Sequence, residues 1–371
     1  MLSVLRKSIK SPEKFEENIN KYINERNKVK LDINKLNLLN TNLKGYSGSF
    51  IAINKSNSIL KIYKKKLKLN YKDEKTCTYL SPIINEIIVN LVLNNLDKLT
   101  KISNRELNFV NKHIIKLNKY GIYNDLQYLS MEKIGFVYNN KYMTNLYDIL
   151  FENHYNWLVK NHNDDELISL YDKMICNKFK EIFKVIKILQ KHINYINSDI
   201  KFVNIFIKET ELKNNKLTKS GCLNNFILLI SDLDKTSIKL NDMNTLIPNY
   251  NYLLKKKIMK YRYNCFNYKL FNCSTLTLYD YDFLAFTFNF LLFILNLEKK
   301  HKIKIVHKFK LTNKLFKDTL NLSSKKYNLI MELIKKNLNT FLLKVSGNYK
   351  YKLSLFTIIL INKYCKIINK M

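Results

Sequence analysis

The sequence predicts an α+β fold in which a small strand-rich part precedes a larger helical part. Short β-like runs lie between residues 41 and 138, and long helical patterns dominate beyond Asn140. With 371 residues, of which 46% are hydrophobic and 13% aromatic, the chain is long and apolar enough to bury a core. We therefore expect a globular protein and exclude a disordered one.

The first expected element is an amphipathic helix within an N-terminal extension, residues 1–40. "SPEKFEENINKYINERNKVKLDINKL" opens with Ser11 and Pro12, which is typical of a helix start. Apolar residues then recur on one helix face, at Phe15, Ile19, Tyr22 and Ile23.

Strands and one helix follow. "SFIAIN" (49–54) and "SILKIYK" (58–64) are β-like runs separated by "KSNS", which predicts a hairpin. "PIINEIIVNLVLNNL" (82–96) has a helical pattern, and "LQYLSMEKIGFVY" (126–138) predicts a strand followed by a turn.

The second part is helical. Helices are expected at 167–193, at the apolar run 283–297 and at 329–345. The charged, asparagine-rich segment 208–225 predicts a surface insertion.

The charge of the chain is strongly positive, since 64 Lys and Arg against 30 Asp and Glu give +34. Such a charge attracts nucleic acid, anionic membranes or acidic proteins. The lysines are spread along the whole chain among many asparagines, so a compositional bias of the genome is the favoured explanation.

Six cysteines without a CxxC pair favour a reduced, intracellular protein. The N-terminus lacks the long apolar core of a signal peptide, so export is not expected. The run 283–295 is shorter than the ~20 residues of a membrane span. A buried central helix, with no transmembrane segment, is the better interpretation.

Three polar residues interrupt the apolar stretch "INSDIKFVNIFI" in the pattern DxKxxN: Asp199, Lys201 and Asn204. In phosphoryl transfer an Asp accepts the proton of the attacking hydroxyl, a Lys reaches the phosphate and an Asn holds a metal ion. Short polar patterns also recur by chance in an Asn- and Lys-rich chain, so the pattern needs support.

That support comes from residues before and after it. Asp232 ends the strand-like run 226–230, where an acid can bind Mg²⁺, although a turn aspartate there is also common. Upstream, Gly45 and Gly48 allow a tight turn over phosphates, Lys61 lies on the next strand and Glu86 is the only acid of helix 83–93. Without the other motifs, Lys61, the first residue of "KIYKKK", would be interpreted as one more surface lysine.

In this order the motifs resemble those of the eukaryotic-type protein kinase family over residues 40–298. The resemblance implies a bilobal protein-kinase-like fold, with an N-lobe at 41–132 and a C-lobe at 133–371. It also implies that ATP and Mg²⁺ are bound.

The resemblance assigns roles to residues. Gly45 and Gly48 match glycines of the loop that covers the phosphates, with Leu43 in place of its first glycine and Phe50 in place of its valine. Lys61 matches the phosphate-binding lysine, and Glu86 matches its ion-pair partner.

Around the adenine, the resemblance places Met131 as gatekeeper, Glu132 at the hinge, Ile59 above the ring and Phe206 below it.

Around the transferred phosphate, Asp199 matches the catalytic base, Lys201 the phosphate-side lysine, and Asn204 and Asp232 the metal ligands. Asp282 in "YDYDF" matches the buried acid that opens the family's central helix.

Some positions depart from the family. Asn197 and Ser198 replace the His and Arg before the base, Asp234 replaces the glycine of DFG, and no APE motif follows. Control by activation-loop phosphorylation is therefore not expected. These features look most like serine/threonine kinases of large cytoplasmic DNA viruses, including poxviruses, which implies a place in the host-cell cytoplasm or the virion.

Lys201 is typical of serine/threonine kinases, so the expected partners are proteins with Ser or Thr acceptors. Acidic substrates are favoured if the basic run 253–263 lies in the activation segment. Nucleic acid is the less favoured partner.

Two other functions stay open. A small-molecule phosphotransferase of the aminoglycoside or choline kinase type also carries an Asp followed five residues later by Asn, but usually lacks the lysine at the position of Lys201. A catalytically weak scaffold would use the +34 charge to bind nucleic acid or acidic partners.

Overall fold

The computed structural model describes the protein at residues 36–37, 49–54, 59–63, 82–123, 126–132, 134–210, 216–233, 236–239, 273–344 and 349–370. Several expected features lie outside these residues: the N-terminal helix, the basic run 253–263, and Leu43, Gly45, Gly48 and Asp234.

The chain divides into two compact units. The first comprises Met1–Ile134, Ile188–Asn197 and Asp232–Cys265, and the second comprises Gly135–Lys187, Ser198–Ser231 and Phe266–Met371. Both units contain helices and strands, which confirms the α+β class.

The first unit contains a five-stranded antiparallel sheet with the order β1-β2-β3-β5-β4. Its strands are β1 (Leu36–Asn37), β2 (Ser49–Asn54), β3 (Ile59–Tyr63), β4 (Leu117–Tyr123) and β5 (Leu126–Met131). β2 and β3 pair in register from Ser49↔Tyr63 to Ile53↔Ile59, which confirms the predicted hairpin. β3 also pairs with β5, so it has a hydrogen-bonded neighbour on each side.

The helices of the first unit are α3 (Pro82–Leu93), α4 (Leu96–Leu99), α5 (Asn104–Lys112) and the last residues of α8 (Asp165–Ile193). α3 starts at Pro82. Proline lacks an N–H, but the N–H at the first position of a helix has no acceptor within the helix, so proline is well tolerated there. Every residue from 86 to 93 is buried, so this helix belongs to the core of the unit. α5 starts with a capping box in which Ser103 and Glu106 satisfy each other's backbone N–H groups.

The strands of the second unit form two hairpins. β6 (Phe136–Tyr138) pairs with β7 (Lys141–Met143), and Asn139 and Asn140 between them both have positive φ, as a two-residue turn requires. β8 (Ile205–Glu209) pairs with β9 (Phe226–Ile230).

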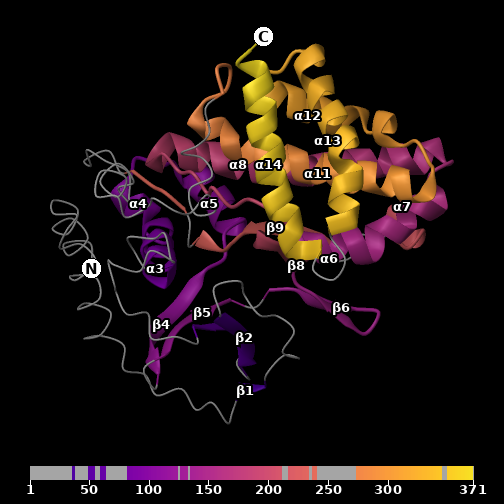
Figure 1. Cartoon of the computed structure of the whole chain (residues 1–371). Coiled ribbons are helices and arrows are strands. Elements are labelled where there is room, and N and C mark those ends of the chain that lie inside the picture. The colour runs from indigo at the N-terminus through magenta and orange to yellow at the C-terminus, as the bar shows by residue number, and fades with distance from the viewer. Residues whose placement is uncertain are drawn as a thin grey trace. The chain divides into compact units, whose positions relative to one another are not determined.

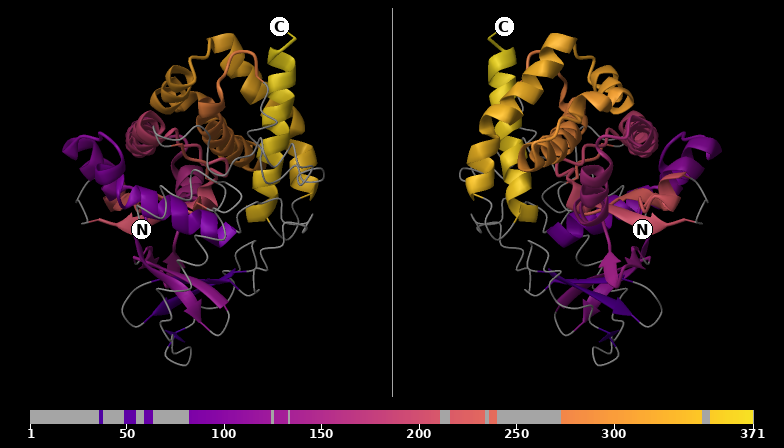
Figure 2. Two further views of the ribbon diagram at one scale, coloured as in Figure 1. Left: turned by 90° about the vertical axis from the view of Figure 1, so that its left-hand side faces the viewer. Right: turned by 90° about the vertical axis from the view of Figure 1, so that its right-hand side faces the viewer.

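The remaining elements of the second unit are helical. They are α6 (Leu146–Asp148), η2 (Ile149–His154), α7 (Tyr155–Asn161), most of α8, η3 (Phe202–Asn204), α9 (Lys216–Lys219), η6 (Leu278–Asp280), α11 (Tyr281–His301), η7 (Val306–Lys308), α12 (Lys310–Thr319), α13 (Ser324–Lys344) and α14 (Tyr349–Ile368). α14 lies alongside α11 and α13 (Figures 1 and 2).

The core of the second unit is built on α11, as the apolar run predicted. All residues from Tyr281 to Leu297 are buried. Phe286 and Phe290 lie edge-on to Phe179 of α8, with ring centroids 4.7 and 5.1 Å apart. α11 is long and apolar enough to pass for a membrane span, but 94% of its apolar window is buried inside the protein. This burial fits the core helix of a folded domain.

One sequence prediction needed correction. Residues 126–138 do not end in a turn, because β5 is followed by a second strand, β6. Gly135 precedes β6 with φ 76°, and a Cβ there would meet the carbonyl oxygen of Met143 at 2.3 Å. The prediction missed β6 because three residues are too few to carry a strand pattern of their own.

Of the predicted surface insertion 208–225 the structure describes 208–210 and 216–225, where exposed charged residues alternate with a few buried apolar ones. Leu217, Cys222 and Leu223 are buried. His154 lies 2.6 Å from the carbonyl oxygen of Leu223, and Trp157 donates to Ser220 at 3.2 Å. The segment is therefore joined to η2 and α7 by these two hydrogen bonds.

Candidate active site

The first cluster is centred on the ammonium group of Lys61. Its neighbours in β3, Leu60 and Ile62, are both buried, and the Lys61 side chain itself is only 10% exposed. A buried charge is costly unless a partner of opposite charge compensates it. The position of Lys61 therefore demands acidic partners.

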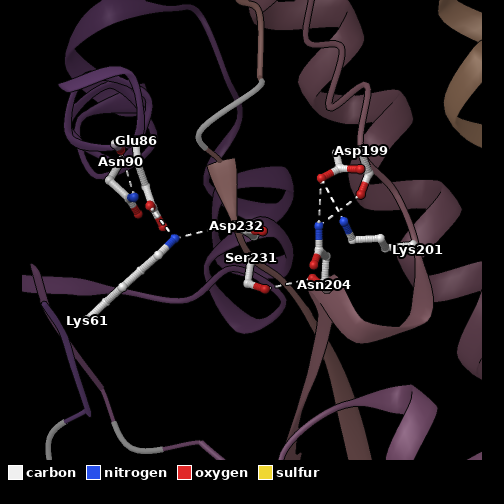
Figure 3. A network of polar contacts seen from close by, with 8 residues as sticks. All are labelled: Lys61, Glu86, Asn90, Asp199, Lys201, Asn204, Ser231 and Asp232. Carbon is white, nitrogen blue, oxygen red and sulfur yellow. Dashed lines mark hydrogen bonds and ion pairs between the residues drawn. The ribbon is translucent and has the colours of Figure 1, made fainter. Parts of the chain in front are cut away.

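Glu86 is the first of these partners. Its carboxylate Oε2 accepts from Lys61 Nζ at 2.7 Å, and its side chain is 2% exposed (Figure 3). Asn90, one helical turn further along α3, donates to the Glu86 carbonyl oxygen at 2.8 Å. The predicted pairing of Lys61 with Glu86 is thus present.

Asp232 is the second partner. Its Oδ1 accepts from Lys61 Nζ at 2.7 Å, and its side chain is 29% exposed (Figure 3). Its φ of 53° lies in the left-handed region, which is uncommon for any residue other than glycine. Strained backbone of this kind persists where the surroundings determine it, and it gathers at functional sites. One cation thus lies between two carboxylates, of which Asp232 is the one that solvent reaches.

The second cluster is centred on the carboxylate of Asp199, which is buried. Lys201 Nζ donates to Asp199 Oδ2 at 3.0 Å (Figure 3). Asn204 Nδ2 donates to the same oxygen at 3.2 Å and to the Asp199 carbonyl oxygen at 3.0 Å. The DxKxxN pattern therefore forms one compact group, closed by the short helix η3.

The backbone before Asp199 is held from α11. Ser198 has a φ of 61°, and its N–H donates to Asp282 Oδ1 at 2.9 Å. Asp282 is 1% exposed, which confirms the buried acid predicted at the start of the central helix. The rings of Phe202 and Phe286, 5.3 Å apart, add a second anchor between this loop and α11.

Ser231 is a site residue that sequence analysis missed. It is buried, and its Oγ donates to the Asn204 carbonyl oxygen at 2.6 Å (Figure 3). The available signal was a small hydroxyl residue between an apolar strand and Asp232. A serine there ties the end of β9 to the start of β8.

The residues expected around adenine are only partly described. Met131 is buried at the end of β5, paired with Ile59 of β3. Glu132 is half-buried; its N–H donates to the Lys116 carbonyl oxygen, and its Oε1 accepts from the Lys116 N–H, each at 3.1 Å. Phe206 is half-buried on β8 and pairs with Leu229. For Phe50 and Ile59 the structure describes the backbone alone.

Two side chains suit a hard cation such as Mg²⁺. Asn204 uses its Nδ2 on Asp199, so its oxygen is the atom left for a metal. Asp232 offers a carboxylate with part of its surface exposed. Within the described residues no group of three or more His, Cys, Asp or Glu could hold a metal. Mg²⁺ commonly binds one or two protein oxygens and completes its shell with phosphates and water, so each of these two oxygens is by itself a suitable ligand.

The two clusters offer complementary chemistry. Lys61 presents positive charge in a fixed direction, which suits phosphate oxygens. Asp199 presents an acceptor with a cation beside it, which suits a hydroxyl that loses its proton as it attacks phosphorus.

Comparisons with known proteins found similarity among solved structures alone. No protein-family model matches the chain, and no curated protein matches it either. Among solved structures, the chain is similar to the kinase domain of PF14_0431, with 13% identity over 82% of this chain and 90% of that chain, and a TM-score of 0.31. A TM-score of this size does not establish a common fold. The functional argument therefore depends on the two clusters.

Proposed function

We propose that the protein is an ATP-dependent phosphotransferase that moves the γ-phosphate of ATP to serine and threonine hydroxyls of proteins. The observation that carries this proposal is the position of Lys61 Nζ, 2.7 Å from both Glu86 and Asp232. A buried lysine held in an ion pair by a glutamate of another element is an arrangement that phosphoryl transfer uses to orient a phosphate-binding cation.

The first cluster would act on the phosphates of the nucleotide. Glu86 holds Lys61 Nζ in place, so the lysine meets phosphate oxygens without the entropy cost of ordering a mobile side chain. Asp232 in this cluster would be a ligand of Mg²⁺, which supplies positive charge against that of the phosphates, and Asn204 of the second cluster is the other residue proposed as a Mg²⁺ ligand.

The second cluster would act on the acceptor. Asp199 accepts a hydrogen bond from the substrate hydroxyl and takes its proton as the bond to phosphorus forms. Lys201, 3.0 Å from the same carboxylate, offsets the negative charge that develops on the transferred group. Asn204 keeps the Asp199 carboxylate in one orientation.

Protein serine and threonine acceptors are proposed over small molecules because Lys201 is in contact with the proposed base. Enzymes of the aminoglycoside and choline kinase type usually lack a lysine at this position. The basic run 253–263 would favour acceptors in acidic sequences if it lies in the activation segment, and nucleic acid is the less favoured partner.

Transfer from radiolabelled ATP in the presence of Mg²⁺ tests the proposal. The acceptors are mixed serine/threonine peptides, a tyrosine peptide, choline and an aminoglycoside. We expect label on serine and threonine with the wild type, little with Asp199→Asn, and wild-type levels with the control Asp318→Asn. Asp318 is exposed and lies in α12, away from both clusters in sequence.

Other outcomes would overturn the proposal in distinct ways. Label on choline or the aminoglycoside alone would assign the small-molecule activity. Equal labelling by the wild type and Asp199→Asn would remove the enzyme assignment. A gel shift with nucleic acid at physiological salt, without any transfer, would favour the scaffold.

A further inference from the structure

Two cysteines that play no part in the proposed phosphoryl transfer lie against each other in the second unit. Cys365 belongs to α14, and Cys273 lies in the irregular stretch before η6. Their thiols are joined by a hydrogen bond, and both residues are buried, with 8% of Cys273 and 3% of Cys365 exposed.

Backbone contacts bring these two segments together independently of the thiols. Ser274, next to Cys273, donates its N–H to Asn369 Oδ1 at 2.6 Å. Asn369 lies one helical turn after Cys365 and donates its N–H to the Cys365 carbonyl oxygen at 2.9 Å. The stretch that begins at Cys273 therefore runs along the face of α14 that carries Cys365.

The surroundings of Cys273 favour its thiolate. Cys365 donates its thiol proton to Cys273, Thr275 adds hydrogen bonds from its backbone and its hydroxyl, and Lys326 contributes positive charge. The hydrogen bond from Cys365 is the largest of these effects, and together they lower the pKa of Cys273 to about 7. The same hydrogen bond, together with burial, raises the pKa of Cys365.

Two other cysteines of the same unit provide a contrast. Cys176 and Cys222 are each 1% exposed. Burial raises the pKa of Cys176 and raises that of Cys222 to about 12. Reactivity of a cysteine follows its thiolate character and its access to solvent. Cys273 adjoins Ser274 and Thr275, which are both exposed, so solvent reaches its neighbourhood.

We propose that Cys273 and Cys365 form an oxidation site, in which hydrogen peroxide converts the dithiol to a disulfide that ties α14 to the segment entering α11, and a thiol reductant restores the dithiol.

The reaction balances in two steps. The Cys273 thiolate attacks one peroxide oxygen, the O–O bond breaks, and hydroxide leaves and becomes water with a proton from solvent. The product is a sulfenic acid on Cys273. Cys365 then attacks the Cys273 sulfur, an S–S bond forms, the S–O bond breaks, and water leaves with the Cys365 proton. The two thiols together lose two electrons, and one peroxide gains them.

The disulfide would close a long loop. It would join Cys273 to Cys365 and so enclose α11, α12 and α13. A covalent link across so many residues lowers the entropy of the unfolded chain, so the oxidised protein is expected to be more stable than the reduced one.

The test uses the full chain with Cys77→Ser and Cys265→Ser, because these two cysteines lie outside the described residues. After treatment with hydrogen peroxide, intact mass and peptide mapping report the products. We expect a Cys273–Cys365 linked peptide, unmodified Cys176 and Cys222, and a thermal midpoint about 5 °C higher that dithiothreitol reverses.

Further substitution of Cys365 by Ser separates the two steps. Without the resolving thiol, Cys273 should accumulate as a sulfenic acid that dimedone traps, and the rise in thermal midpoint should vanish. If this variant does not fold, the peptide map of the protein that carries only Cys77→Ser and Cys265→Ser tests the proposal by itself. Absence of the Cys273–Cys365 peptide, or oxidation of Cys176 and Cys222 as fast as that of Cys273, would overturn the proposal, whatever the protein's kinase activity proves to be.

Discussion

The two clusters of the candidate site are built in opposite ways. In the first, one cation, Lys61, lies between two carboxylates that come from α3 and from the end of β9. In the second, one carboxylate, Asp199, receives hydrogen bonds from a lysine and an amide within the next five residues. The first is therefore suited to hold negative phosphate, and the second is suited to accept a proton.

The two clusters also differ in how far apart their members lie in the sequence. The partners of Lys61 are distant in sequence, so its environment exists only when the unit is folded. The partners of Asp199 lie in the same short loop. Substitutions in the first cluster should therefore affect nucleotide binding and local order together, and substitution of Asp199 in the second should affect the chemical step without a loss of nucleotide binding.

The largest effect is expected for Asp199→Asn. The amide keeps the shape and the contact with Lys201 but cannot take the hydroxyl proton, so kcat should fall about 10³-fold. Affinity for ATP, measured by fluorescence titration with Mg²⁺, should stay within about twofold of the wild type because Asp199 belongs to the acceptor side. A matched loss in ATP affinity would contradict the contrast between the clusters.

The next largest effect is expected in the first cluster. Lys61→Met should lower kcat/KM about 10²-fold, since a preorganised cation is lost, and Glu86→Gln should lower it about tenfold, since the cation remains but is less fixed. The double variant should resemble Lys61→Met, because Glu86 acts through Lys61. Additive losses, measured by steady-state kinetics on all three variants, would show that Glu86 acts independently.

The stability of the second unit should depend on pH, and this sets the pH range in which the activities of the variants can be compared. His154 is fully buried, with Nε2 2.6 Å from the Leu223 carbonyl oxygen and Nδ1 3.0 Å from the Tyr171 hydroxyl. Desolvation by burial lowers the pKa of His154 to about 4. The folded protein therefore protonates His154 only at a lower pH than the unfolded chain does. Its contribution to stability is present above pH 6.5 and is lost as the pH falls toward 4, by up to about 3 kcal/mol.

Urea unfolding of the wild type and His154→Gln at pH 7 and pH 4 measures this effect. Between pH 7 and pH 4 the free energy of unfolding of the variant is expected to fall by about 3 kcal/mol less than that of the wild type. At pH 7 the variant is expected to be the less stable of the two proteins. Equal losses in both proteins would assign the acid sensitivity to other groups.

The smallest effect is expected for Ser231→Ala, which removes the hydrogen bond to the Asn204 carbonyl oxygen. We expect a threefold to fivefold loss in kcat, about 1 kcal/mol, because Asn204 is still held by Asp199. The Mg²⁺ concentration for half-maximal rate should rise as well, and Ser231→Thr should restore it. Ser220→Ala is the control, since that serine binds Trp157 instead. An unchanged Mg²⁺ requirement in Ser231→Ala would assign Ser231 to stability only.

The element pattern was predictable where the local sequence is strongly apolar. The apolar run of α11 and the β-like runs of β2 and β3 carry signals stronger than any competing local preference. In the segment 208–225 the sequence did not show which residues become buried, because charged residues surround Leu217 and Leu223. Burial of these two leucines depends on parts of the chain outside the segment.

The sequence by itself determined the second cluster, because Asp199, Lys201 and Asn204 are near enough along the chain for one turn to bring them together. It also determined the buried helix α11, because burial is the only low-energy state for so long an apolar stretch in water. The tertiary structure alone decided that Lys61 contacts Glu86 and Asp232, that Ser231 supports Asn204 and that Cys273 meets Cys365. Contacts between distant residues depend on strand order and helix packing, and these arise from the whole folded chain.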